Sequence, residues 1–174
     1  MNDRNLLIVG AGAYADVAFE IASDMGCFDR IDFVDDNKEA TPNGHKVAGK
    51  VKDIGGLCVN YTDIVVAIGN PKIRLSFLEM AKRDTKLNVA TLISPRAYVS
   101  PSALVKAGCI LEPMAVVHSG CALEEGCIVS AGAVVNHSSN CGRGVHVDCN
   151  AVVAGYTVVP AETKICFGEV YTDK

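Results

Sequence analysis

Apolar side chains recur at every sixth residue through the second half of the chain, from residue 97 to residue 174. Read in sixes, all thirteen third positions are apolar, and eleven of the thirteen first positions are Ala, Cys, Ser or Thr. A period of six matches neither the 3.6-residue turn of a helix nor the two-residue alternation of a long strand. It predicts very short strands broken by regular corners, with one apolar side chain per face directed at a shared axis. The pattern is typical of a hexapeptide β-helix.

The repeat also predicts how this half is stabilised. One rung cannot bury its own apolar side chain, so the rungs must stack and share a continuous core. Six of the thirteen last positions are glycine, which relaxes the turns. The alternative is a Val- and Ala-rich stretch of an ordinary β domain, and thirteen rungs in one frame argue against it. We expect an all-β parallel β-helix domain over residues 97–174.

The first 93 residues lack the six-residue repeat and alternate strand-like with helix-like segments. The strand-like segments are 6–12, 31–36, 63–70 and 87–94, and the helix-like ones are 16–25 and 73–83. Gly26 follows the first helix as a stop signal. Alternation of strands and helices favours a parallel sheet. We expect a Rossmann-like α/β domain over residues 1–93.

A glycine-rich turn follows the first strand of this domain. Gly10 and Gly12 let the backbone approach a ligand, and the next helix offers free N–H groups to a phosphate. Asp35 and Asp36, at the end of the second strand, are placed to accept hydrogen bonds from ribose or a base. Residues 67–70 end a strand at the same edge. Such turns often serve tight packing only. The domain is about half of a dinucleotide fold, so a single nucleotide is favoured over NAD.

Composition narrows the class of protein. The 174 residues are 49% apolar, the net charge is −4, and no block of Lys and Arg indicates a nucleic-acid surface. The apolar runs are too short for a membrane span, and no signal segment precedes the first strand, so we expect a cytoplasmic protein. None of the eight cysteines forms a Cys-x-x-Cys pair, which disfavours a zinc site. Those in the repeat replace Ala or Val, as reduced buried cysteines do.

The combination resembles the sialic acid O-acetyltransferase group of sugar acyltransferases, and within it the acetyltransferases of UDP-4-amino sugars. The likeness covers nearly the whole chain and depends on GAGAYA, FVDD and AIGN-x-x-x-R, then VVNHS with a second histidine nine residues later, and AVVAG. It implies a left-handed β-helix with three hexapeptides per turn. It also implies a homotrimer with active sites between subunits, acetyl-CoA as co-substrate, a UDP-sugar acceptor and no metal.

Roles carried over from that resemblance fall on specific residues. His137 is implied as the general base, and an imidazole with an unperturbed pKa of about 6.5 can take a proton from the attacking amine near neutral pH. Gly155, one turn later, is implied to offer its N–H to the thioester oxygen, with His146 near the acetyl group. The residues implied to hold the nucleotide sugar are Gly10, Gly12, Tyr14, Asp35, Asp36, Gly69 and Asn70.

Three positions depart from the family's pattern: Ser138, Tyr14, and Ala15, which stands where relatives often have glycine. Ser138 follows His137 where relatives commonly have an acidic residue, and a hydroxyl can orient the ring without stabilising imidazolium. Tyr14 stands where relatives often have histidine, and it could still touch the sugar. A histidine at a corner often has no function, but the neighbours of His137 favour a catalytic role. His118 lies one turn before Asn136 and could line the same groove.

Three other functions remain open at this point. The protein could O-acetylate a sialic-acid-like sugar, or it could bind a nucleotide sugar without catalysis. A γ-type carbonic anhydrase would need His118, His137 and His146 as zinc ligands, and their spacing does not match that family. The main prediction is direct transfer of acetyl from acetyl-CoA to a UDP-4-amino-4,6-dideoxy sugar, with no covalent enzyme intermediate.

Overall fold

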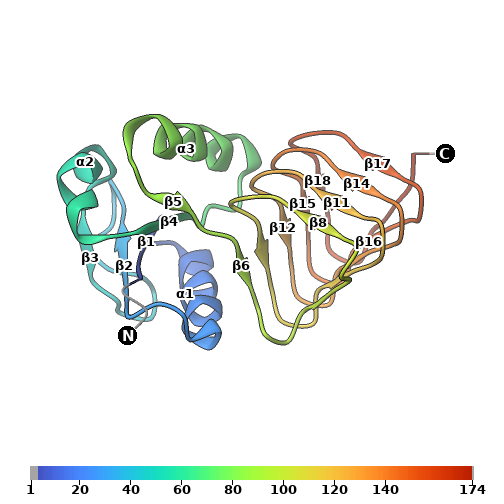
Figure 1. The fold of residues 1–174 in the computed structure, drawn as a ribbon, viewed down its shortest axis with the longest axis horizontal. Helices are drawn as coiled ribbons and strands as arrows, with labels where there is room; N and C mark the ends of the chain where they lie inside the picture. The colour runs from blue at the N-terminus through green and yellow to red at the C-terminus, as the bar shows by residue number, and fades with distance from the viewer. Residues whose placement is uncertain (1–3, 174) are drawn as a thin grey trace. The chain divides into compact units, whose positions relative to one another are not determined.

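The computed structural model describes residues 4–173, so residues 1–3 and 174 of the expected domain ranges lie outside the described part. The chain divides into two compact units, 1–90 and 91–174. The first is an α/β unit and the second is a left-handed parallel β-helix, which confirms the predicted fold class (Figure 1).

A five-stranded parallel sheet of order β3-β2-β1-β4-β5 forms the centre of the α/β unit. Figure 1 shows α1 and α3 on opposite faces of this sheet. The elements are β1 (Asn5–Val9), α1 (Ala13–Met25), β2 (Arg30–Val34), β3 (Val47–Gly49), η1 (Val51–Asp53), α2 (Ile54–Leu57), η2 (Cys58–Asn60), β4 (Asp63–Val66), α3 (Pro71–Asp84) and β5 (Asn88–Val89).

Local sequence signals explain where its helices begin and end. Helix α1 ends at Gly26, whose left-handed backbone donates its N–H to the carbonyl of Ser23. Helix α3 begins at Pro71 after Asn70, whose side chain accepts the N–H of Ile73 as an N-cap. The core lies between the sheet and its helices, and Leu7, Val9, Val34, Ile64 and Leu78 are almost completely buried there.

The described part of the second unit contains fourteen two-residue strands. The first is β6, and the other thirteen follow the predicted hexapeptide frame. They are β6 (Leu92–Ile93), β7 (Tyr98–Val99), β8 (Leu104–Val105), β9 (Ile110–Leu111), β10 (Val116–Val117), β11 (Ala122–Leu123), β12 (Ile128–Val129), β13 (Val134–Val135), β14 (Asn140–Cys141), β15 (His146–Val147), β16 (Val152–Val153), β17 (Val158–Val159), β18 (Lys164–Ile165) and β19 (Val170–Tyr171).

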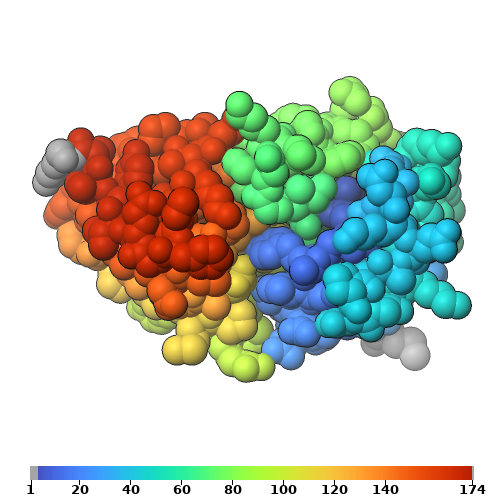
Figure 2. Space-filling view, turned by 180° about the vertical axis from the view of Figure 1, so that it is seen from behind, coloured from blue at the N-terminus to red at the C-terminus, as the bar shows by residue number. Residues whose placement is uncertain are grey.

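The strands form three sheets, in which residues eighteen apart pair in parallel register, as Val117 does with Val135 and Val135 with Val153. The third positions from Leu111 to Ile165 point into one core and are fully buried. The cysteines are free, as expected, and burial raises the pKa of the Cys141 thiol to about 12. Figure 2 shows the surface of the last coils in orange to red, where Val158, Phe167 and Val170 are exposed.

The segment 87–94 differs from its prediction as one strand of the first unit. Asn88–Val89 is β5, which pairs with β4. Leu92–Ile93 is β6, which pairs with β9 and belongs to the β-helix. The reason is that Leu92 and Ile93 already lie eighteen residues before Ile110 and Leu111, so they continue the stacking frame one rung earlier than residue 97. Strand β3 and the short helices between residues 51 and 60 were not predicted.

Candidate active site

The glycine turn lies where the strand order of the α/β sheet reverses, between β1 and β4. Gly10 has a φ of 109°, and its N–H donates to the carbonyl of Val34 at 2.8 Å. A methyl group on Gly10 would lie 3.1 Å from the carbonyl oxygen of Ala67 and 3.2 Å from Cγ1 of Ile68. Both the backbone angle and the close approach therefore require glycine. The structure brings the two predicted glycine segments together at a carboxyl edge, where open α/β sheets bind ligands.

The N-terminus of α1 provides the N–H groups of this edge. Gly12 is its N-cap and supplies no capping side chain, so first-turn N–H groups are left for an anion. A methyl group on Gly12 would lie 3.9 Å from Nζ of Lys38. Tyr14 sits half-buried in the first turn. Lys38 was not among the predicted site residues, and its only signal in the sequence is its position two residues after the paired aspartates.

The two aspartates are both tied to backbone. Asp35 Oδ2 accepts the N–H of Ala11 at 2.9 Å, and its Oδ1 accepts those of Asn37 and Lys38. Asp36 Oδ1 accepts the N–H of Val51 at 3.0 Å, and in residues 4–173 its Oδ2 takes no hydrogen bond. Asp35 thus shapes the glycine turn and the loop after β2, and Asp36 keeps an oxygen available to a ligand.

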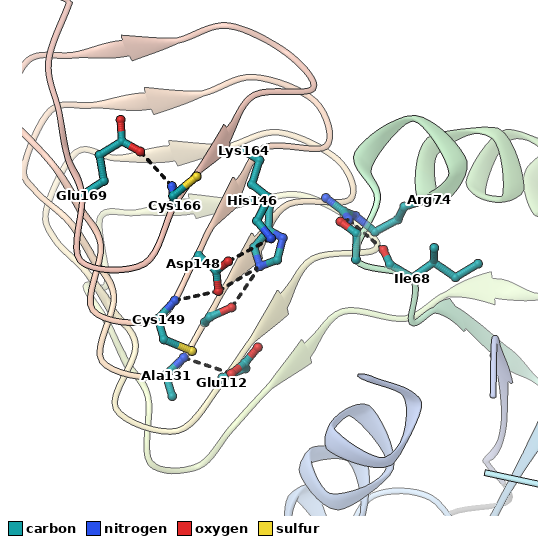
Figure 3. Close-up of polar contacts among 12 residues, drawn as sticks. Ile68, Arg74, Glu112, Ala131, His146, Asp148, Cys149, Lys164, Cys166 and Glu169 are labelled. Carbon is teal, nitrogen blue, oxygen red and sulfur yellow. Dashed lines mark hydrogen bonds and ion pairs between the residues drawn. The ribbon is translucent and has the colours of Figure 1, made fainter. Parts of the chain in front are cut away.

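Helix α3 fixes the second glycine segment. The Arg74 side chain is buried, and its Nη1 donates to the carbonyls of Ile68 and Gly69, both at 2.8 Å (Figure 3). Asn70 caps the helix, so its side-chain oxygen is already in use. The sequence pattern AIGN-x-x-x-R contains this arginine but gives it no role, and its position one turn into a helix is the signal that could have indicated one.

A cavity of 270 Å³ opens at this edge of the sheet. Val51, Ile68, Ile73 and Phe77 provide apolar walls, and the remaining lining residues are Val9, Gly10, Asp35, Asp36 and Asn37. Apolar walls with a few polar groups suit a planar base with hydrogen-bonding edges. A larger cavity of 510 Å³ lies at the starts of β4 and β5, away from the glycine turn.

In the β-helix, His137 lies at the corner between β13 and β14, and its ring lies against the next coil. A methyl group on Gly155 would be 3.2 Å from both Cε1 and Nε2 of His137, so a side chain there would displace the ring by a few tenths of an ångström. The ring of Tyr156 meets that of His137 edge-on, with centroids 5.0 Å apart and planes at 86°. Within the described chain, the His137 ring makes no hydrogen bond and the Gly155 N–H has no acceptor. Tyr156 was not among the predicted site residues.

The neighbours of His137 hold its backbone. Asn136 Oδ1 accepts the His137 N–H at 2.8 Å and lies 3.0 Å from Nδ1 of His118. The predicted stacking of His118 on Asn136 is therefore correct. Ser138 is exposed with a φ of 60°, and its N–H donates to the carbonyl of Ser119. Its hydroxyl does not contact the His137 ring through any hydrogen bond among the described residues.

His146 belongs to a separate buried cluster (Figure 3). Its Nε2 lies 3.1 Å from Oγ of Ser130 and 3.9 Å from Oδ1 of Asp148. Both partners face the same nitrogen, so the group lacks the geometry of a Ser-His-Asp triad, in which the carboxylate orients the other nitrogen. Burial raises the pKa of Asp148, but the Lys164 ammonium at 2.9 Å, the Cys149 N–H and the charge of His146 outweigh it and hold the pKa below its usual range.

One chain does not bring the two predicted acetyl-site histidines together. His137 follows β13 and precedes β14, whereas His146 opens β15 in the third sheet, and the core separates that sheet from the corner. His137, Gly155 and Tyr156 form one group and His146 another. Among residues 4–173, no three His, Cys, Asp or Glu side chains are placed to hold a metal. No described helix is long and apolar enough to cross a membrane.

Comparison with known proteins gives consistent results. Residues 5–81 match the PglD N-terminal domain family. The acetyltransferase domain of PglB from Neisseria gonorrhoeae FA1090 is 33% identical with a TM-score of 0.90, covering 96% of this chain and 82% of that one. The same domain in complex with acetyl coenzyme A gives 34% and 0.91, covering 96% and 81%. PerB from Caulobacter crescentus, in complex with CoA and GDP-perosamine, shares the fold at 20% identity with a TM-score of 0.79, covering 96% and 88%. No curated protein matches the chain.

Proposed function

The chain belongs to the acetyltransferase family of the PglB domain, and from this premise we propose that it acetylates the amino group of a nucleotide-linked 4-amino sugar. Acetyl-CoA is the donor and a UDP-4-amino-4,6-dideoxy sugar the acceptor. The observation that supports the proposal is the close approach of the His137 ring to the Gly155 backbone. A Cβ atom added to Gly155 would lie 3.2 Å from Cε1 and Nε2 of that ring. The proposed base then lies beside the backbone that carries the proposed N–H donor.

The chemistry follows from these two groups. The sugar amine attacks the thioester carbonyl carbon, and a His137 ring nitrogen takes the proton that the amine loses. The Gly155 N–H donates to the oxyanion, and one such donor contributes roughly 2.7–4 kcal/mol. The C–S bond then breaks, the thiolate of CoA takes the proton, and the products are an amide and free CoA. A positioned base typically contributes ~10²–10⁴-fold.

The nucleotide is assigned to the carboxyl edge of the α/β sheet. The diphosphate would lie at Gly10, Gly12 and the start of α1, where Lys38 adds a positive charge. The base would enter the 270 Å³ cavity, with Asp36 Oδ2 accepting one of its N–H groups or a ribose hydroxyl. Asp35, Gly69 and Asn70 would act through the backbone that they shape, and Tyr14 would face the sugar.

A homotrimer with sites between subunits is also part of the proposal. His137 and His146 lie on opposite sides of one prism, so both can approach one acetyl group only if a second copy supplies one of them. His146 is buried beside Ser130 in the single chain and would have to be reached there. Cytoplasmic localisation follows from the CoA and nucleotide substrates and is equally a proposal.

Release of free thiol from acetyl-CoA tests the proposal, with UDP- and GDP-linked 4-amino sugars compared as acceptors. We expect turnover with the UDP sugar and a loss of ~10²-fold or more in His137→Ala. Glu162→Ala, at an exposed corner of the same prism, is the matched control and should match the wild type. Nucleotide-sugar binding without thiol release would favour a non-catalytic binder, and turnover unaffected by His137→Ala would move the base elsewhere.

A further inference from the structure

Tyr156 occupies a backbone conformation that disfavours its side chain. Eleven sixth positions of the described hexapeptides have a left-handed backbone: six are glycine with φ from 66° to 76°, and the other five are Met114, Ser138, Asn150, Tyr156 and Glu162 with φ from 56° to 64°. Tyr156 has a φ of 60°, which costs an L-residue roughly 1–2 kcal/mol. Strain of this kind persists where the surroundings hold it. Because four other non-glycine corners share this conformation, it is the contacts of the Tyr156 ring that distinguish this residue.

Core packing does not explain the tyrosine, because its side chain is 68% exposed. Its contacts are instead with His137. The Tyr156 N–H donates to the His137 carbonyl at 3.1 Å, and the two rings meet edge-on at 5.0 Å. Such pairs contribute roughly 0.5–1.5 kcal/mol beyond the area they bury.

The His137 ring has few other restraints. Asn136 holds its backbone N–H and Gly155 underlies its Cε1 and Nε2, but within residues 4–173 no side chain hydrogen-bonds to the ring. The adjacent Ser138 is exposed, and among the described residues its hydroxyl makes no hydrogen bond to the His137 ring. Without an aromatic neighbour, rotation about the side-chain bonds of His137 would carry its nitrogen away from Gly155.

We propose that Tyr156 is a positioning residue for His137. The tyrosine ring fixes the imidazole over Gly155 by edge-on aromatic contact, in the place of a hydrogen-bonding partner. The proposal rests on the proposed function, because it assumes that His137 is the base. It accounts for the exposed aromatic ring at this corner and for the imidazole that lacks a hydrogen bond.

The kinetic test compares Tyr156→Phe, Tyr156→Leu and Tyr156→Gly. We expect the leucine and glycine variants to lose about tenfold or more in kcat with little change in either KM, since misplacing a catalytic group by 1 Å can cost ~10²-fold. Tyr156→Phe keeps the ring and should retain most of kcat. An equal loss in the phenylalanine variant would overturn the proposal in favour of a hydroxyl contact. A rise in KM at unchanged kcat would overturn it in favour of substrate binding.

Glu162→Gly is the matched control for backbone strain. Glu162 is exposed, has a φ of 61°, and donates its N–H to the Arg143 carbonyl at 2.8 Å in the same corner geometry. Both glycine variants relieve a left-handed residue, so both should leave Tm unchanged or raise it. Only Tyr156→Gly should lose activity, and a parallel loss in the control would contradict the proposal.

A measurement without substrate separates this proposal from the proposed function. The His137 ring-proton resonances should carry the ring-current shift of Tyr156 in the wild type and in Tyr156→Phe, and should move in the leucine and glycine variants. Identical resonances in all four proteins would overturn the positioning role even if the enzyme turns over. If no acceptor sugar supports turnover, the proposed function fails, and the resonances still decide whether Tyr156 orients His137.

Discussion

The two halves of the chain place their functional residues in different ways. In the β-helix the surroundings of a residue recur every eighteen positions, so Val117, Val135 and Val153 do the same work and a departure is conspicuous. His137 and Tyr156 lie at a corner, outside these uniform core positions. In the α/β unit no position recurs, and a side chain acquires its role from where a strand ends.

This difference shows in the buried charges. Arg74 of the α/β unit donates to the backbone carbonyls of one loop, at Ile68 and Gly69, and no neighbouring turn repeats this arrangement. Asp148 of the β-helix pairs with Lys164 on the next coil, two residues before residue 166, which is the stacking position of Asp148. We therefore expect substitutions to be more damaging in the α/β unit, where the support of the nucleotide edge is not repeated along the chain.

The largest effect is expected for Arg74→Met. Hydrogen bonds to a charged group contribute roughly 1.5–3 kcal/mol each, and this change removes those to the carbonyls of Ile68 and Gly69. Thermal unfolding should show a strong loss of stability, and calorimetry should show no UDP binding. Arg83→Met removes an exposed arginine from the same helix and is the control. Equal Tm and equal nucleotide affinity in the two variants would contradict this account.

Gly155→Ala should produce the next largest effect, and on activity only. The added methyl group would lie 3.2 Å from the His137 ring, which must move. We expect a loss of roughly 10–100-fold in kcat, with little change in stability because Gly155 itself lacks the left-handed φ of Tyr156. Gly55→Ala, where a methyl group meets nothing within 4 Å, is the control in the other unit. Full activity in the Gly155→Ala enzyme would contradict the assignment of the Gly155 backbone to the active site.

The sequence predicted the β-helix almost residue by residue, because one frame is repeated thirteen times and each rung confirms the last. It placed His137 over Gly155 for the same reason, since 137 and 155 are eighteen apart. Tyr156 escaped notice because its ring contact depends on a left-handed backbone at its own position. The extra rung at Leu92 was missed because its sixth position is Arg96 rather than glycine, and because its strand continues the apolar segment 87–94.

In the α/β unit the sequence predicted β1, β2, β4, the two long helices and the edge, but neither β3 and the short helices nor what each side chain does at the edge. Asp35 was expected to hold ribose, yet its oxygens accept three backbone N–H groups. Lys38 approaches Gly12 because the loop after β2 folds back, and no periodicity encodes that path. Roles that depend on loop geometry could therefore not be predicted from the pattern.

Lys38→Ala sharpens the comparison with a smaller effect. Loss of one exposed charge beside the start of α1 should weaken UDP binding about 5-fold, which corresponds to about 1 kcal/mol. The difference from the wild type should shrink in high salt, because exposed charges are screened. Lys46→Ala, an exposed lysine in the same loop, is the control. Equal weakening in both variants would show that only net charge matters.

The smallest effect concerns pH and compares one carboxylate in each unit. The pKa of Asp148 is held below its usual range, so its ionised form stabilises the fold above about pH 4, and this contribution is lost as pH falls through the lowered pKa. The Tm difference between wild type and Asp148→Asn should be a few degrees at pH 7 and shrink below about pH 4. Asp84 also has a lowered pKa beside Arg83, but it is exposed, so Asp84→Asn should change Tm less and lose its effect in high salt. The Asp148 contribution should persist in high salt because that carboxylate is buried. If salt removed it, the Asp148–Lys164 ion pair would be screened by solvent as an exposed pair is, and the expected difference between the two carboxylates would be absent.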